Sequence, residues 1–231
     1  MPDRLIVTEE NQLKEVSVPD SPSQPAWIRF IATIISYVFH PLFIPVYLTY
    51  FVFTTRAYQF AGIDPWAKTL KLLLVFITCC FFPLISVLLL RALNFIESIY
   101  LKTQKDRIIP YIICMTFYFS VWYYFKKNHE VADLVSMALA IFNASVAGFL
   151  LNIIIKVSMH AIAVGVMTTF IAILAFHETV NLSLYLSIAF FIAGIVCTSR
   201  MIVSDHRPGE IYIGFIAGIL SQLAAQYFVN S

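Results

Sequence analysis

The stretch Ser199-Arg200-Met201-Ile202-Val203-Ser204-Asp205-His206-Arg207-Pro208-Gly209-Glu210 separates two long apolar runs near the C-terminus. It holds two arginines, a histidine and two acids between segments that are otherwise apolar. Charged side chains at the edge of a membrane are costly and are usually kept for a function. The fold must hold these groups at a membrane boundary, and the rest of the sequence indicates which groups meet them there.

The composition predicts an integral membrane protein. The chain has 231 residues, of which 60% are hydrophobic and 12% are charged, and its mean hydropathy is +0.84. Soluble globular domains carry about 25% charged residues. We therefore expect an all-α, polytopic membrane helical bundle with about six to seven transmembrane helices. A net charge of +2 is too small to indicate nucleic-acid binding.

The chain divides into a polar tail and one membrane domain. Residues 1–26 are polar, rich in Ser and Pro and without an apolar signal-peptide core, which is typical of a flexible tail. Residues 27–231 form a single transmembrane domain. Its first apolar run, Trp27–Phe53, contains Pro41 and Pro45, so we expect one crossing with a kink.

Hydropathy and parity place three polar clusters on one side of the membrane. The expected spans are Trp27–Phe53, Lys68–Leu93, 111–125, Leu134–Ile155, 161–176, Leu182–Thr198 and Ile211–Val229. The clusters at 102–110, 156–160 and 199–210 are separated by even numbers of crossings, so they emerge together. The segment Asn94–Lys105 is weakly amphipathic, and we expect it to lie in the interface.

Each cluster leads into an expected helix. Pro110, Ser158 and Pro208 stand near the starts of three spans. A helix N-terminus has free N–H groups and a positive dipole end, so it favours anions. Basic side chains accompany these helix starts: Arg107, Lys156, Arg200 and Arg207. Because guanidinium groups bind two phosphate oxygens at once, the sequence predicts a phosphate-binding cradle at the membrane surface.

The opening stretch resembles the third motif of the type 2 phosphatidic acid phosphatase (PAP2) superfamily. Ser199-Arg200, five residues, His206, three residues and Glu210 reproduce the spacing of that motif. The family pattern ends in Asp, where this chain has Glu210. Glu210 is four positions after His206, so the two side chains share a face if the segment is helical.

The other two PAP2 motifs are matched in part. The second family motif is Pro-Ser-Gly-His, and this chain has Val157-Ser158-Met159-His160. The first is Lys, six residues and Arg-Pro, whereas here Arg107 is followed by two isoleucines before Pro110, and Tyr100 stands at the Lys position. The interval from Arg107 to the second motif also contains two apolar spans, more than we expect for the family.

The resemblance implies a PAP2-like core and metal-independent, cofactor-free removal of phosphate from a lipid phosphate or a polyprenyl or other lipid diphosphate. His206 would be the nucleophile that forms a phosphohistidine. Glu210 would orient it, and His160 would be the general acid. The implied phosphate-binding residues are Arg200, Arg107, Ser158, Lys156 and Lys105.

The sequence is also compatible with other functions. The same basic cradle would also serve a non-catalytic protein that binds or carries an anionic lipid. A metal-dependent enzyme is disfavoured, because His, Asp and Glu do not cluster at ligand spacing. His40, beside Pro41, is expected to pack between helices, and Gly214 and Gly218 predict a close helix contact inside the bundle.

The resemblance also favours a bacterial cytoplasmic (inner) membrane as the location. The side that carries the three clusters holds ten of the fifteen Lys and Arg residues. The positive-inside rule would place that side in the cytoplasm, whereas resemblance to bacterial family members favours the outer face. When the six basic residues that could bind phosphate are left out, four Lys and Arg residues remain on the cluster side and five lie on the other side. The two orientations therefore both stay open.

Overall fold

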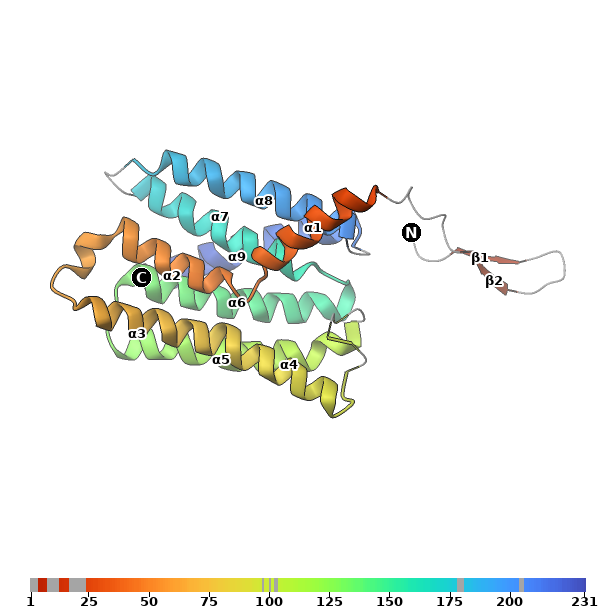
Figure 1. Ribbon diagram of the computed structural model, residues 1–231, viewed down its shortest axis with the longest axis horizontal. Helices are drawn as coiled ribbons and strands as arrows, with labels where there is room; N and C mark the ends of the chain where they lie inside the picture. Colours follow the sequence, from red (N-terminus) through yellow and green to blue (C-terminus); the bar gives the residue numbers. More distant parts are fainter. Residues whose placement is uncertain are drawn as a thin grey trace.

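The structure is a computed structural model and describes residues 4–7, 13–16, 24–96, 98–99, 101, 104–177, 181–203 and 206–231. Ser204 and Asp205 of the opening stretch lie outside the described residues. Within the expected tail, β1 (Arg4–Val7) and β2 (Leu13–Val16) pair antiparallel, with Arg4 opposite Val16. Figure 1 shows this hairpin standing apart from the helices.

The first apolar run forms two helices joined by a sharp break. The helix α1 (Ala26–Val38) ends just before His40, and α2 (Ile44–Thr55) begins just after Pro41. The break has a local cause, because proline lacks an N–H and keeps the preceding residue out of helical geometry. Figure 1 shows α1 and α2 meeting at an angle, in agreement with the expected kink.

The next span contains a wide turn. The helices α3 (Pro65–Phe76) and α4 (Phe82–Ala92) are joined by a π-helical turn, Ile77–Phe81, into one apolar stretch of 28 residues. Pro83, the second residue of α4, cannot donate a backbone hydrogen bond, which accounts for a local change from α-helical pairing at this point.

Five long helices complete the bundle: α5 (Gln104–Lys127), α6 (Ala132–Ile154), α7 (Met159–His177), α8 (Ser183–Val203) and α9 (Pro208–Asn230). With the α3–α4 stretch, the described chain has six helices that are long and apolar enough to cross a membrane. Large apolar side chains such as Phe190 and Phe191 point outward. The protein is therefore an integral membrane protein built as a polytopic α-helical bundle.

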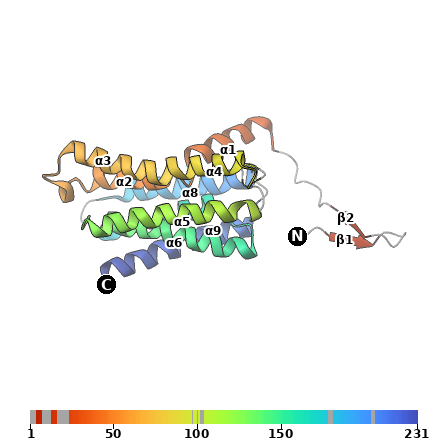
Figure 2. The same cartoon turned by 90° about the horizontal axis from the view of Figure 1, so that it is seen from below.

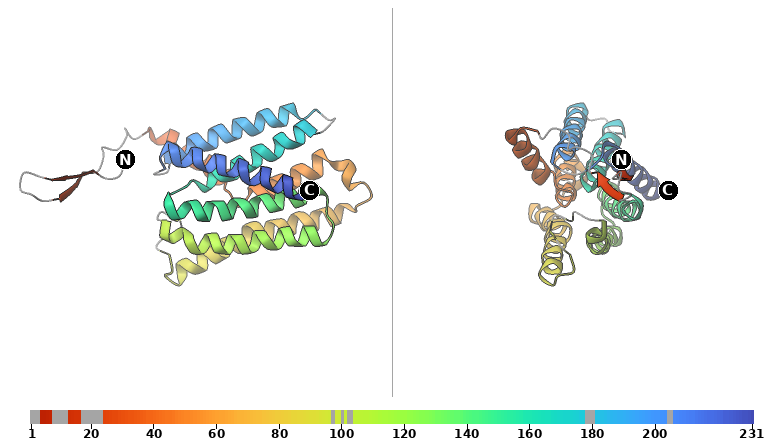
Figure 3. Two further views of the ribbon diagram at one scale, coloured as in Figure 1. Left: turned by 180° about the vertical axis from the view of Figure 1, so that it is seen from behind. Right: turned by 90° about the vertical axis from the view of Figure 1, so that its right-hand side faces the viewer.

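The centre of the bundle is formed by α6, α7 and α9, which pack closely against one another. The left panel of Figure 3 shows α9 lying across α6 and α7. A Cβ at Gly218 would collide with the carbonyl of Ile162, and a Cβ at Gly165 would collide with the carbonyl of Phe215. The expected close contact at the Gly214–Gly218 pair is confirmed, and it lies inside the bundle.

The three polar clusters emerge at the same end of the bundle, as parity predicted. In Figure 1 this is the end where α5, α7 and α9 begin, and Figure 2 shows the same arrangement from below. The segment Asn94–Lys105 was expected to lie in the interface. Among its described residues, those before Gln104 are not helical, and Asn94 and Leu101 adopt positive φ angles of 61° and 48°. The described residues between α4 and α5 thus form turns.

Candidate active site

His206 and Glu210 form a hydrogen-bonded pair at the start of α9. The His206 Nδ1 lies 3.0 Å from the Glu210 Oε2, and the His206 side chain is only 3% exposed. Pro208 begins α9 because its missing N–H costs nothing at the first helical position. The same Glu210 oxygen accepts a hydrogen bond from the Arg207 backbone N–H at 3.2 Å. The carboxylate thus caps the helix and holds His206 at once.

This pair fixes which nitrogen of His206 carries a proton. A carboxylate only accepts hydrogen bonds, so the Nδ1 of His206 donates to Glu210 and the Nε2 keeps its lone pair. Burial lowers the pKa of His206 below its ordinary 6.5, and the charges of Arg107 and Arg200 lower it further, against the opposing effect of Glu210. The imidazole is therefore neutral near pH 7 and has a nucleophilic nitrogen.

Ser158 joins the start of α7 to the start of α9. It is fully buried, its backbone N–H donates to the Glu210 carbonyl at 3.4 Å, and its hydroxyl accepts a hydrogen bond from the Ala161 N–H at 3.4 Å. Gly214 makes this approach possible, because a Cβ there would come within 2.9 Å of the Ser158 carbonyl. Ser158 thus lies beside the His206 segment, with its backbone N–H already used by Glu210.

Arg107 is buried near His206 but is bound to backbone oxygens. Its Nε donates to the Leu101 carbonyl at 2.8 Å, and its Nη1 donates to the Val157 carbonyl at 2.9 Å. These bonds tie the start of α5 to the α6–α7 connection. Of the three guanidinium nitrogens of Arg107, Nε and Nη1 make these two backbone bonds, and Nη2 is the third. Arg107 therefore contributes positive charge beside His206 and also holds two of the three clusters together.

His160 lies in the first turn of α7 and contacts the α1–α2 break. Its Nε2 is 3.1 Å from the Ser36 carbonyl. Because a carbonyl only accepts, this nitrogen carries the proton and Nδ1 is the nitrogen that can exchange one. The rings of His160 and His40 meet edge to face, with centroids 5.2 Å apart. His206 and Arg200 are close enough for their charges to act on His160.

The remaining basic residues occupy different places. Arg200, in the last turn of α8, is partly buried and lies near Arg107, His160 and His206. Lys105 is exposed and Lys156 is partly exposed. Within the described part of the chain, neither lysine side chain forms an ion pair or hydrogen bond. The structure thus brings Arg200, Arg107, Ser158 and both histidines together, with the two lysines at the margin.

His40 is the residue of this site that the sequence did not assign to it. Its Nδ1 accepts a hydrogen bond from the Leu42 N–H at 3.3 Å, so its orientation is fixed by the turn in which it stands. The available signal was a lone histidine beside a proline inside an apolar run. That signal does not reveal that α1 and α2 bend next to the start of α7.

Comparisons with known proteins returned no relative. A scan against protein-family models, a search of curated proteins and a search of solved structures each found no match. The geometry of the site is therefore the basis of the functional conclusions below.

Proposed function

We propose that this protein removes phosphate from a lipid phosphate or lipid diphosphate, without a metal, through a phosphohistidine at His206. The observation that carries the proposal is the His206–Glu210 pair, which leaves the Nε2 of a neutral, buried imidazole free to attack. Arg107 and Arg200 supply positive charge around it, as a phosphate group requires. The resemblance of residues 199–210 to the PAP2 motif points to the same chemistry.

In the first step, the Nε2 lone pair of His206 attacks phosphorus and forms a P–N bond while the bond to the leaving oxygen breaks. Glu210 stabilises the positive charge that develops on the imidazole. His160, in its protonated form, gives the Nδ1 proton to the leaving alkoxide or phosphate. The Ser36 carbonyl keeps the ring oriented by holding the Nε2–H.

In the second step, a water oxygen attacks the phosphoryl group and the P–N bond breaks. The electron pair returns to the Nε2 of His206, and inorganic phosphate leaves. His160 takes up the proton from the attacking water at Nδ1, which restores its starting state. The two steps together consume one water and need no oxidant, reductant or metal.

The position of the site, where lipid headgroups can reach it, supports a lipid substrate. The site lies at the end of the bundle where three transmembrane helices begin. A phosphate at the membrane surface meets this end without leaving the lipid layer. Phosphatidate, phosphatidylglycerol phosphate and polyprenyl diphosphate all present phosphate at this depth.

The proposal is tested by phosphate release from these three lipids in detergent micelles containing EDTA. Wild-type protein should release phosphate from at least one of them, and His206→Gln and His160→Gln should not. Tight lipid binding with no release by the wild type would instead identify a non-catalytic lipid-binding protein. Release at the wild-type rate by both variants would contradict the assigned roles.

A further inference from the structure

A groove at the end of the bundle opposite the His206 site is lined by both charged and apolar side chains. It has a volume of about 450 Å³ and opens between α5, α6 and α9. Trp122 and Lys126, which line it, lie near the C-terminus of α5. From Arg107 to Trp122 the distance along α5 is about 22 Å, at about 1.5 Å per residue. The groove therefore faces the other leaflet of the membrane.

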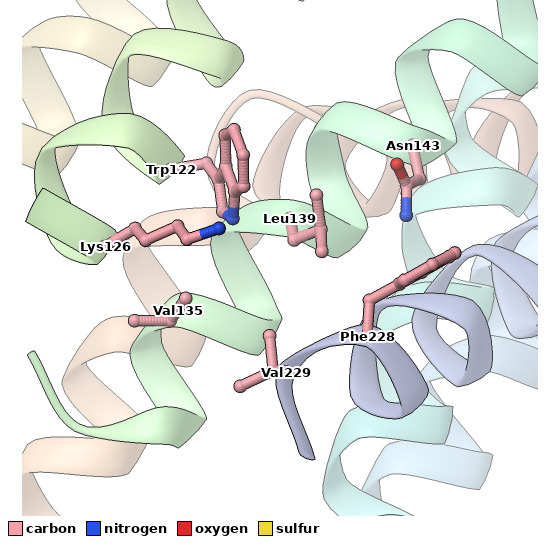
Figure 4. A pocket seen from close by; sticks show the side chains of 7 residues that line it. All are labelled: Trp122, Lys126, Val135, Leu139, Asn143, Phe228 and Val229. Carbon is pink, nitrogen blue, oxygen red and sulfur yellow. The ribbon is translucent and has the colours of Figure 1, made fainter. Parts of the chain in front are cut away.

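Two nitrogen donors stand at the polar end of this groove. Figure 4 shows the side chains of Trp122 and Lys126 beside each other, and the Lys126 Nζ lies 5.2 Å from the centre of the Trp122 ring. Among the described residues, the Trp122 Nε1 is buried without an acceptor. A buried N–H without an acceptor is unusual and indicates a partner that completes it.

Two acids at this end of the bundle are already paired with basic side chains. Lys71 pairs with Glu130 at 2.6 Å, and Arg56 pairs with Asp133 at 2.9 Å. Within the described chain, Lys126 has no acidic side chain within ion-pair distance. The positive charge at the mouth of the groove is therefore available to an outside anion.

Apart from Asn143 of α6, the rest of the groove is apolar. Val135 and Leu139 of α6 form one wall, and Phe228 and Val229 of α9 form the other, as Figure 4 shows. Phe228 is exposed at the rim. The lining thus combines a cation and an N–H donor at one end with a hydrophobic channel, which matches a phospholipid with its phosphate at the surface and a chain along the helices.

We propose that this groove binds an anionic phospholipid of the leaflet opposite the His206 site. Lys126 and the Trp122 N–H bind the phosphate, and one acyl chain lies between α6 and α9. The site is separate from the proposed phosphatase chemistry and does not depend on it. The occupant is a lipid because the groove lies between membrane-spanning helices and because the charge of Lys126 favours an anionic headgroup.

Fluorescence quenching of Trp122 by brominated lipids tests this site. The background Trp27→Phe/Trp66→Phe leaves Trp122 as the only tryptophan of the three in the chain. In vesicles, dibrominated phosphatidylglycerol should associate about fivefold more strongly than dibrominated phosphatidylcholine, the factor that one lysine contributes near an anionic surface. The ratio should fall to about one in Lys126→Gln and be restored in Lys126→Arg.

Lys127→Gln is the matched control. Lys127 is the next residue, is exposed and does not line the groove. The fivefold preference should persist in that variant. Equal association of the two lipids with the parent protein, as a second copy of the chain seated in the groove would give, would overturn the proposal. Loss of the preference in Lys127→Gln to the same extent as in Lys126→Gln would overturn it too.

Discussion

The Nδ1 of His206 lies 3.0 Å from a carboxylate oxygen of Glu210, and that same oxygen caps α9 through the Arg207 N–H at 3.2 Å. The helix start and the orientation of the imidazole are thus set by one side chain. Any movement of the first turn of α9 would move His206 with it. A rigid element that positions a reactive group in this way is typical of preorganised catalytic sites.

Replacing Glu210 by Gln should nearly abolish phosphate release. The Gln amide nitrogen can donate to Nδ1 of His206, which would shift the imidazole proton to Nε2 and remove the nucleophilic lone pair. We expect kcat to fall by about 10³- to 10⁴-fold, the scale of a tautomer reversal in a catalytic dyad. The measurement is phosphate release from the best lipid substrate.

Glu210→Asp is the conservative control for that variant. It keeps the negative charge and restores the residue found in the PAP2 pattern. We expect activity within about tenfold of the wild type, because the carboxylate still accepts from Nδ1 after a small shift. Equal losses in Glu210→Asp and Glu210→Gln would indicate that capping of α9, and not the tautomer of His206, explains the effect.

The pH dependence of kcat/KM should show an acid limb with a midpoint below 6.5. Burial and the charges of Arg107 and Arg200 lower the pKa of His206, so the neutral nucleophile persists to lower pH before protonation removes it. Arg200→Gln removes a charge that lowers this pKa, so the limb should move to higher pH. Glu210, which raises the pKa of His206, and the neighbouring His160 are present in both the wild type and Arg200→Gln.

The limb is measured for both proteins with the same lipid, so that ionisation of the substrate phosphate cancels. An acid limb that is identical in the wild type and in Arg200→Gln would show that His206 is not the group whose protonation controls the rate. A shift to lower pH would contradict the sign expected from the position of Arg200.

His40 should act as a positioning residue for His160. The two rings meet edge to face at 5.2 Å, and the His160 Nε2 is held by the Ser36 carbonyl. In His40→Ala the ring of His160 loses its neighbour, and we expect kcat to fall by up to about 100-fold with little change in KM. His40→Phe keeps an aromatic ring at this place and should recover most of the activity.

The readout that separates positioning from simple packing is the pair of kinetic constants, measured beside the unfolding midpoint. A loss of stability in His40→Ala that fully accounts for the lost activity would assign His40 to packing alone. Equal activity of His40→Ala and the wild type would remove the residue from the site altogether.

Gly218→Ala should destabilise the bundle. A Cβ at Gly218 would overlap the carbonyl of Ile162 and the backbone nitrogen of Val166, neither of which can rotate away. Overpacking of this kind costs about 1–3 kcal/mol. Gly194→Ala is the control, because a Cβ there meets no atom within 4 Å. Thermal unfolding in detergent should show a lower midpoint for Gly218→Ala only, and equal midpoints would contradict the close α7–α9 contact.

Much of the architecture could be predicted from local properties of the sequence. Apolar length predicts the spans, and parity then places residues 102–110, 156–160 and 199–210 at one end. The His206–Glu210 pair was expected from helical spacing, but His206 precedes α9 and Arg207 is extended, so the contact arises from the capping of α9 by Glu210. These features are set by residues that are close together in the sequence, which is why they can be predicted from it.

The parts that could not be predicted depend on packing between distant segments. The His40–His160 contact joins residues 120 positions apart and needs the angle between α1 and α2. The acceptors of Arg107, at Leu101 and Val157, are backbone carbonyls that carry no residue-type signal. The turn at Asn94 is set by a left-handed backbone that the weak amphipathic pattern of this segment does not indicate.

The central claim is that His206 becomes phosphorylated during turnover. Purified protein is mixed with a lipid phosphate in EDTA, quenched with alkali, under which phosphohistidine survives, and analysed by peptide mass spectrometry. We predict that the peptide containing His206 gains the mass of one phosphoryl group, and that Glu210→Gln and His206→Gln do not show this gain. Rapid phosphate release with no phosphorylated His206, and an unchanged rate in His206→Gln, would contradict the account.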